Sequence, residues 1–169
     1  MKKYMFLLVL ALIAVQFTFA QDLNQLMNDM SKIEGAQHQV VDREMLNTSM
    51  NAAMEADSTG RLKSEMPAFM QKMESVEVVA IEEYSPEVKE RFQKEINGFR
   101  DGNGYETLLS VKDEGDNVRI ISYKDGDQIL GVYILVLDEE DAVVVKMFGN
   151  LNESDLTDII NEQKKNKQN

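Results

Sequence analysis

Residues 105–148, YETLLSVKDEGDNVRIISYKDGDQILGVYILVLDEEDAVVVKMF, decide the fold of this chain. Apolar runs rich in Val, Ile, Leu and Tyr alternate here with three short acidic connections, two of which contain glycine, and this is the pattern of strands joined by tight hairpins. The strands are expected at Tyr105–Lys112, Val118–Tyr123, Gln128–Leu137 and Ala142–Phe148. Strands that follow one another through short turns pair antiparallel, so the stretch predicts a four-stranded antiparallel meander.

The third of these strands is apolar on both faces, which tells where the meander lies in the molecule. One set of alternate positions contains Ile129, Tyr133, Leu135 and Leu137, and the other contains Leu130, Val132, Ile134 and Val136. A strand that is apolar on both sides is covered on both sides. Either helices cover both faces of the sheet, or one face meets a partner.

The chain before the meander reads as helices separated by short strands. Helices are expected at 22–34, 42–56, 67–73 and 85–99, where Asp22, Asp42 and Ser85 are capping residues and Pro67 and Pro86 open a first turn. Strands are expected at 37–41 and 75–82, and a last helix begins at Asn152 or Ser154. The sequence thus predicts an α+β domain over 21–163: N-terminal helices with short strands, then the meander, closed by a C-terminal helix and followed by a polar flexible tail at 164–169.

The N-terminus has the three parts of a secretory signal peptide. Lys2 and Lys3 form a positive start, Met5–Val15 is an apolar run, and Thr18 and Ala20 are small residues before a cut after Ala20. The apolar run is shorter than the roughly 20 residues of a membrane span, and no Cys is present to carry a lipid. We therefore expect an exported protein, periplasmic or extracellular, that is soluble after cleavage and does not insert stably into a membrane.

The charge of the chain limits its partners. The formal net charge is −12, and it becomes −14 when Lys2 and Lys3 leave with the signal. Such a chain repels nucleic acid, because binding to nucleic acid depends on Lys and Arg that neutralise phosphates. No cofactor motif and no phosphate-binding loop are present. The oligomeric state is left open.

Eleven methionines raise the question of copper, because thioethers bind Cu(I). Their spacing argues for packing instead. Leu23, Leu26, Met27, Met30 and Ile33 form one helical stripe, and Met45, Leu46, Ser49, Met50, Ala53 and Met54 form a second. Both stripes are expected to be core faces of amphipathic helices.

Candidate catalytic residues are few. His38 is the only histidine and has no Cys nucleophile to pair with, so it is expected to be structural or on the surface. A hydrolase that uses two carboxylates stays an alternative. With 30 acidic residues the sequence does not select a pair, and Glu82, Glu83 and Asp101 show no distinguishing pattern.

The acidic turns of the meander suggest a cation. Alternate turns of a meander emerge at the same end of the sheet, so two acidic connections are brought together there. Hard cations such as calcium take oxygen ligands. A weak calcium-binding structural module is therefore a further alternative, with the candidate ligands Asp113, Glu114, Asp116, Asp138, Glu139, Glu140 and Asp141.

Several stretches carry a family resemblance. They are Lys32–Ala36, Asp42–Leu46, Met73–Val76 and Leu108–Leu156, with Phe148-Gly149-Asn150-Leu151 before the last helix as the most telling. Together they resemble the domain-of-unknown-function family 4252, whose members are similar to exported envelope proteins of the Bacteroidetes. The resemblance implies no activity and no site residues; it implies an envelope sensing or accessory role near sigma-factor systems. The leading hypothesis is an exported, non-enzymatic binding or accessory protein of the cell envelope, linked to envelope signalling, with an envelope protein as its partner.

Overall fold

The computed structural model describes residues 22–62, 66–113 and 116–166. The predicted signal peptide, residues 1–20, lies outside these residues. In the described part, no helix is long and apolar enough to cross a bilayer.

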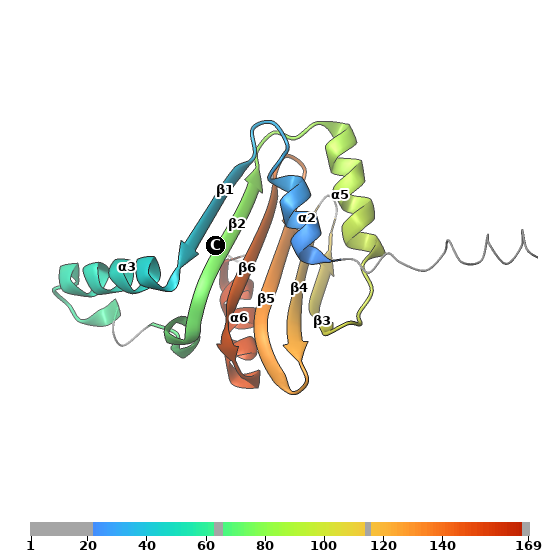
Figure 1. Ribbon diagram of the computed structural model, residues 1–169. Helices are drawn as coiled ribbons and strands as arrows, with labels where there is room; N and C mark the ends of the chain where they lie inside the picture. Colours follow the sequence, from blue (N-terminus) through green and yellow to red (C-terminus); the bar gives the residue numbers. More distant parts are fainter. Residues whose placement is uncertain (1–21, 63–65, 114–115, 167–169) are drawn as a thin grey trace, which may run out of the picture.

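One antiparallel sheet organises the described chain (Figure 1). Its six strands are β1 (Gln37–Asp42), β2 (Met73–Ile81), β3 (Tyr105–Lys112), β4 (Asn117–Asp125), β5 (Gln128–Leu137) and β6 (Ala142–Leu151). Their order across the sheet is β1-β2-β6-β5-β4-β3. The predicted meander is therefore confirmed as β3 to β6, but it is not a separate four-stranded sheet, because the two short strands expected before it, β1 and β2, belong to the same six-stranded sheet. β2 pairs with β6, and β1 pairs with the other side of β2. The pairing of β2 with β6 joins segments that are far apart in the chain, so no local pattern in the sequence predicts it.

The helices begin where capping side chains satisfy the free N–H groups of the first turn. Asp22 accepts from Asn24 N, Asp42 from Met45 N, Ser85 from Val88 N and Asn152 from Asp155 N. These caps start α2 (Leu23–Met30), α3 (Arg43–Ala56), α5 (Pro86–Gly98) and α6 (Glu153–Asn166). The short 3-10 helix η1 (Ala68–Lys72) follows Pro67, and α6 includes the first three residues of the predicted polar tail.

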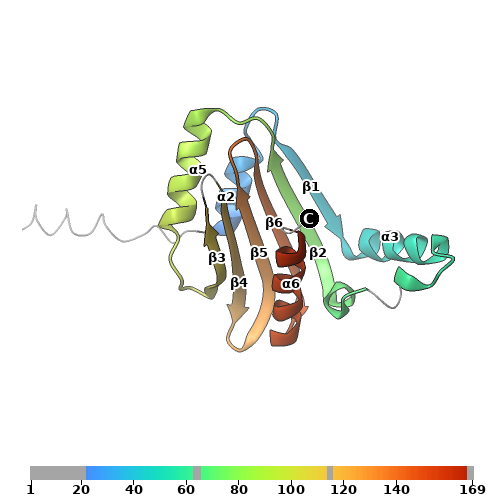
Figure 2. The ribbon, with the colours of Figure 1, turned by 180° about the vertical axis from the view of Figure 1, so that it is seen from behind.

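Helices cover both faces of the sheet, so the two-sided burial expected for β5 is confirmed. α2 and α5 lie on the front face, the face seen in Figure 1, where Phe92 and Met27 pack on Tyr133 and Leu135. α6 and η1 lie on the back face (Figure 2), over Val132 and Ile134. Ile129 joins the back cluster and not the front one, because a bulge between Ile129 and Gly131 shifts the register.

The two methionine stripes have different fates. In α2 the stripe is core, and Met27 and Met30 are 2% and 1% exposed. In α3 no residue is buried, so the expectation of a second core face is wrong. Both views show α3 extending beyond β1, away from the sheet (Figures 1 and 2). The stripe has the right spacing, but the described chain places no sheet or helix of the body against most of it.

Candidate functional site

The sheet ends in two edge strands, β1 and β3, which differ in how their outer sides are treated. An edge strand presents unpaired N–H and C=O groups, and these can template pairing with another chain. The contacts at each edge therefore decide which side of the molecule is available to a partner.

The first part of the β3 edge, from Tyr105 to Thr107, is closed by the segment that precedes it. Tyr105 N donates to Gly102 O and Gly102 N donates to Tyr105 O, both at 2.9 Å. The N–H of Thr107 donates to Asp101 Oδ1 at 3.0 Å, and its hydroxyl donates to the same oxygen at 2.6 Å. These bonds, with the Thr107 hydroxyl first, lower the pKa of Asp101. A bulge between Thr107 and Leu109 interrupts the edge further.

Arg119 holds this closing segment in place. Its guanidinium donates to Ile96 O at 2.6 Å, to Phe99 O at 3.2 Å and to Thr107 Oγ1 at 3.0 Å. It also lies 5.2 Å from the centroid of the Phe99 ring. Charge-assisted bonds to the last carbonyls of a helix satisfy groups that the helix leaves free. The end of α5 is therefore fixed to β4 beside the edge.

The β1 edge is open on its outer side. Antiparallel strands alternate residues that bond to one neighbour with residues that bond to the other. The N–H of Thr107 points away from β4. Applying this alternation strand by strand, from β3 through β4, β5, β6 and β2 to β1, shows that the N–H and C=O groups of His38 and Val40 point away from β2. No backbone group among the residues described pairs with these outward groups.

β1 also lacks the devices that protect edges. Its sequence, QHQVVD, has no Lys and no Pro, and its pairing with β2 has no bulge. Val40 is 53% exposed. The strand thus offers a regular, unprotected backbone with an apolar side chain at its centre.

The segment Arg43–Leu62, which we call the arm, extends from the end of β1. Its first turn is fastened to the body: the Arg43 guanidinium donates to Met73 O at 3.2 Å, and Leu46 packs at the margin of the back cluster. Its far end is folded on itself, because Asp57 accepts from Thr59 Oγ1 at 2.5 Å and from Leu62 N at 2.7 Å. These hydrogen bonds lower the pKa of Asp57.

Apolar side chains reach the surface along the arm. Met50 and Met54 continue the stripe of Leu46 and are half-buried, whereas Met45 and Leu62 are 50% and 45% exposed. Methionine is used at surfaces that bind partners because its side chain is flexible and polarisable. β1 and the arm together form what we call the open edge.

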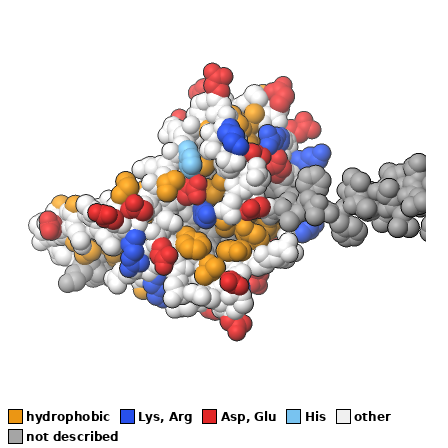
Figure 3. Space-filling model, viewed as in Figure 1, with side chains coloured by type: hydrophobic (Ala, Val, Ile, Leu, Met, Phe, Trp, Pro, Cys, Tyr) orange, Lys and Arg blue, Asp and Glu red, His pale blue; other side chains and the backbone are white. Residues whose placement is uncertain are grey.

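A row of polar side chains crosses the front face next to the open edge (Figure 3). His38 Nε2 lies 2.9 Å from Glu77 Oε1, and Lys146 Nζ lies 3.9 Å from Glu77 Oε2. Lys146 and the hydroxyl of Tyr133 both donate to Asn24 Oδ1, at 2.7 and 2.9 Å. His38 is thus a surface residue with a carboxylate partner, and the row ties β1 to α2.

The two acidic turns emerge at the same end of the sheet, as the meander requires. In the first turn, Asp113 and Asp116 exchange backbone hydrogen bonds, and Glu114 lies outside the described residues. Within the described residues, no group of three or more acidic or histidine side chains is placed to hold a metal ion. Calcium binding stays a prediction.

The second acidic turn is fastened to the start of α5. The Asp138 carboxylate accepts from Glu140 N and Asp141 N within its own turn, at 2.9 and 2.7 Å. Lys89 Nζ donates to Glu139 O, and the Tyr84 hydroxyl donates to Asp138 O. Burial, followed by the charges of Asp138 and Asp141, raises the pKa of Tyr84 to about 12. The turn therefore has a structural role.

The carboxylates considered for hydrolysis are not brought together. The Glu82 carboxylate accepts a hydrogen bond from Gln37 Nε2 at 3.3 Å, and Glu83 follows it with a positive φ of 54°. Asp101 lies at the other edge of the sheet, where its carboxylate accepts a hydrogen bond from the Thr107 hydroxyl. Two acids that work as a pair in a glycosidase must flank one bond. Nothing in this placement favours such a pair.

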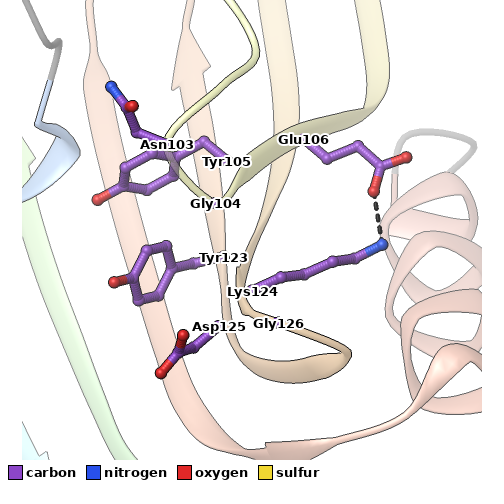
Figure 4. Close-up of a pocket in the computed structure, with 8 residues that line it drawn as sticks. All are labelled: Asn103, Gly104, Tyr105, Glu106, Tyr123, Lys124, Asp125 and Gly126. Carbon is purple, nitrogen blue, oxygen red and sulfur yellow. Dashed lines mark hydrogen bonds and ion pairs between the residues drawn. The ribbon is translucent and has the colours of Figure 1, made fainter.

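A shallow recess of about 480 Å³ lies at the ends of β3 and β4 (Figure 4). Tyr105 and Tyr123 point to one side of it, whereas Glu106 and Lys124 point to the other. Glu106 and Lys124 form an ion pair at 2.5 Å, and this hydrogen bond raises the pKa of Lys124. The recess presents an ion pair where a glycosidase would present two facing acids.

These features define the class of protein: an α+β domain built on one antiparallel sheet, with helices on both faces, one closed edge and one open edge. The family model described as "Domain of unknown function (DUF4252)" matches residues 31–159, more than half of the chain, and the chain belongs to this family. No curated protein and no solved structure matches it.

The open edge had a weak signal in the sequence. The strand at 37–41 is expected to be short, and it contains no Lys, Arg, Asp, Glu or Pro. The first acidic residue after it is Asp42. The arm had a misleading signal, because its stripe has the same spacing as that of α2. Nothing local indicates that Asp101 and Gly102 close the β3 edge.

Proposed function

We propose that this chain is an exported, non-enzymatic binding or accessory protein of the cell envelope, and that the open edge is its binding surface. The observation that carries the proposal is the contrast between the two edges. Asp101 and Gly102 close β3, whereas the outward backbone groups of His38 and Val40 have no described backbone partner. An exposed strand edge and an unburied helix stripe are both features that proteins use to bind peptides or partner proteins.

The composition of the arm favours a protein partner over a lipid surface. Helices that lie on membranes carry Lys and Arg on their polar face. Here the polar positions of α3 include Asn47, Thr48 and Asn51, and the only basic residue of the helix, Arg43, donates to backbone carbonyls at its first turn. The link to envelope signalling comes from the family resemblance alone and stays a prediction.

The proposal is tested by crosslinking in the native envelope. A photoreactive residue is placed at Met45, on the open edge, and in a matched variant at Val111, which is 37% exposed on β3 at the opposite edge of the sheet. We expect one defined protein to crosslink from position 45, and the yield to fall when Met50→Glu is added. Equal products from both positions, or no product from position 45, would contradict the proposal.

A further inference from the structure

We infer that the partner of the open edge is a basic, extended segment of another protein, which adds to β1 as a seventh strand. This inference rests on the proposed function and names its partner class. Strand addition draws affinity from main-chain hydrogen bonds and specificity from alternate side chains. Each of these two requirements is met by a separate property of the open edge.

The backbone requirement is met by His38 and Val40. Each turns one N–H and one C=O outward, in a strand that pairs with β2 without a bulge. An antiparallel or parallel segment finds these groups at the regular spacing of a ladder. β3 offers no such spacing, because Tyr105 and Thr107 already bond to Gly102 and Asp101 and the bulge between Thr107 and Leu109 interrupts the ladder beyond them.

The length of the segment is limited by the arm. α3 begins at Arg43, directly after β1 ends at Asp42, and extends past the outer side of β1, where a seventh strand would lie (Figures 1 and 2). A bound strand therefore has about six residues along β1 before one of its ends meets α3. At that end, Met45, which is 50% exposed, is available to an apolar side chain of the segment.

Charge decides the chemistry of the occupant. Residues 37–62 and 73–81 contain six acidic residues and two arginines; Glu77 is paired with Lys146 of β6, and the other five are Asp42, Glu44, Glu55, Asp57 and Glu74. The whole chain is acidic as well, at −12. A second copy would bring the same negative charge to the same edge, and like charges across an interface are unfavourable. A segment with lysines or arginines is complementary to this edge.

The experiment uses a defined probe, a capped peptide of about eight alternating valine and lysine residues. Two control peptides replace lysine with glutamate, or N-methylate alternate residues so that one edge of the peptide loses its N–H groups. Binding is measured with the purified protein and with two variants, Val40→Pro and Val40→Thr. Pro removes the outward N–H, whereas Thr keeps it and remains a good strand residue.

We expect the lysine peptide to bind and the other two peptides to bind at least about tenfold more weakly. We expect Val40→Pro to weaken binding about three- to tenfold, the value of one net hydrogen bond, and Val40→Thr to change it less than about twofold. On binding, the amides of His38 and Val40 gain protection from hydrogen exchange.

The inference is overturned if the N-methylated or glutamate peptide binds as well as the lysine peptide, or if no peptide binds. It is also overturned if Val40→Pro, shown to be folded by its unfolding temperature, binds like the unmodified protein. If these results come together with a specific crosslink from position 45, strand addition fails while the proposed function stands. Loss of that crosslink removes the proposed function as well.

Discussion

β1 and β3 end the same sheet, yet one edge is closed and the other is left open. At β3 the chain returns on itself: Gly102 bonds to Tyr105 in both directions and the Asp101 carboxylate takes the N–H of Thr107. At β1 the chain leaves at Asp42 and the arm extends outward instead of back over the strand. The difference shows that edge protection is available to this fold and is applied at one side only.

The largest effect on stability is expected from a proline in β1 at a residue that bonds to β2. Gln39 bonds to β2, whereas the N–H and C=O of Val40 point outward, so Gln39→Pro removes a ladder hydrogen bond and Val40→Pro does not. We expect Gln39→Pro to lower the free energy of unfolding by about 2–4 kcal/mol and Val40→Pro by about 1 kcal/mol or less. Urea unfolding followed by circular dichroism measures both. Equal losses would show that β1 has no free side.

The next effect concerns the tight approach at the start of the closed edge. Gly104 has φ +87°, and a Cβ there would lie 2.4 Å from Lys124 O. Gly60 in the arm also has a positive φ, +69°, but nothing lies within 4 Å of its Cβ position. We expect Gly104→Ala to cost about 2–3 kcal/mol and Gly60→Ala about 1 kcal/mol, because only the first adds a backbone clash to the strain. Similar costs in thermal unfolding would count against close packing at β3.

A smaller effect follows from removing the carboxylate that closes β3. Asp101→Asn is expected to cost about 1 kcal/mol. The folded pKa of Asp101 lies below its ordinary value of 3.8, so its contribution is present above pH 3.8 and is lost as the pH falls through the folded pKa. The stability difference between the two proteins, measured by urea unfolding across this range, should shrink on acidification. A stability difference that grows toward low pH would contradict a stabilising role of the ionised Asp101 carboxylate.

The smallest effect is expected on the arm. Met45→Ser should change the free energy of unfolding by less than about 0.5 kcal/mol, because Met45 is 50% exposed. Met27, in the matching stripe of α2, is 2% exposed and serves as the control, where the same change is expected to be several times more costly. If both substitutions are equally destabilising, the arm is packed and does not form a free surface.

The sequence predicted the parts of this comparison that depend on local pattern. Alternating apolar runs and acidic turns located β3 to β6, and Asp22, Asp42 and Ser85 located three helix starts. The joining of β2 to β6 was missed, because Val76 and Met147 are far apart in the chain and either could pair elsewhere. α3 was misjudged because a stripe shows which face of a helix is apolar, not whether the chain packs anything against that face.

The candidate site was even less accessible to sequence reasoning. Predicted ligands such as Asp138 turn out to bond within their own turn. The residues that distinguish the edges act through the backbone, as His38 and Val40 do, or through a single side chain six positions away, as Asp101 does for Thr107. Backbone direction depends on the register of all six strands, which only the three-dimensional arrangement supplies.

Hydrogen exchange at four amides tests the central claim most directly. The amides of His38 and Val40 are expected to exchange rapidly in the free protein, whereas those of Tyr105 and Thr107 are protected by Gly102 and Asp101. NMR or mass spectrometry of the purified protein resolves the two edges. Protection of His38 and Val40 equal to that of Tyr105 and Thr107 would contradict the division of the sheet into an open and a closed edge.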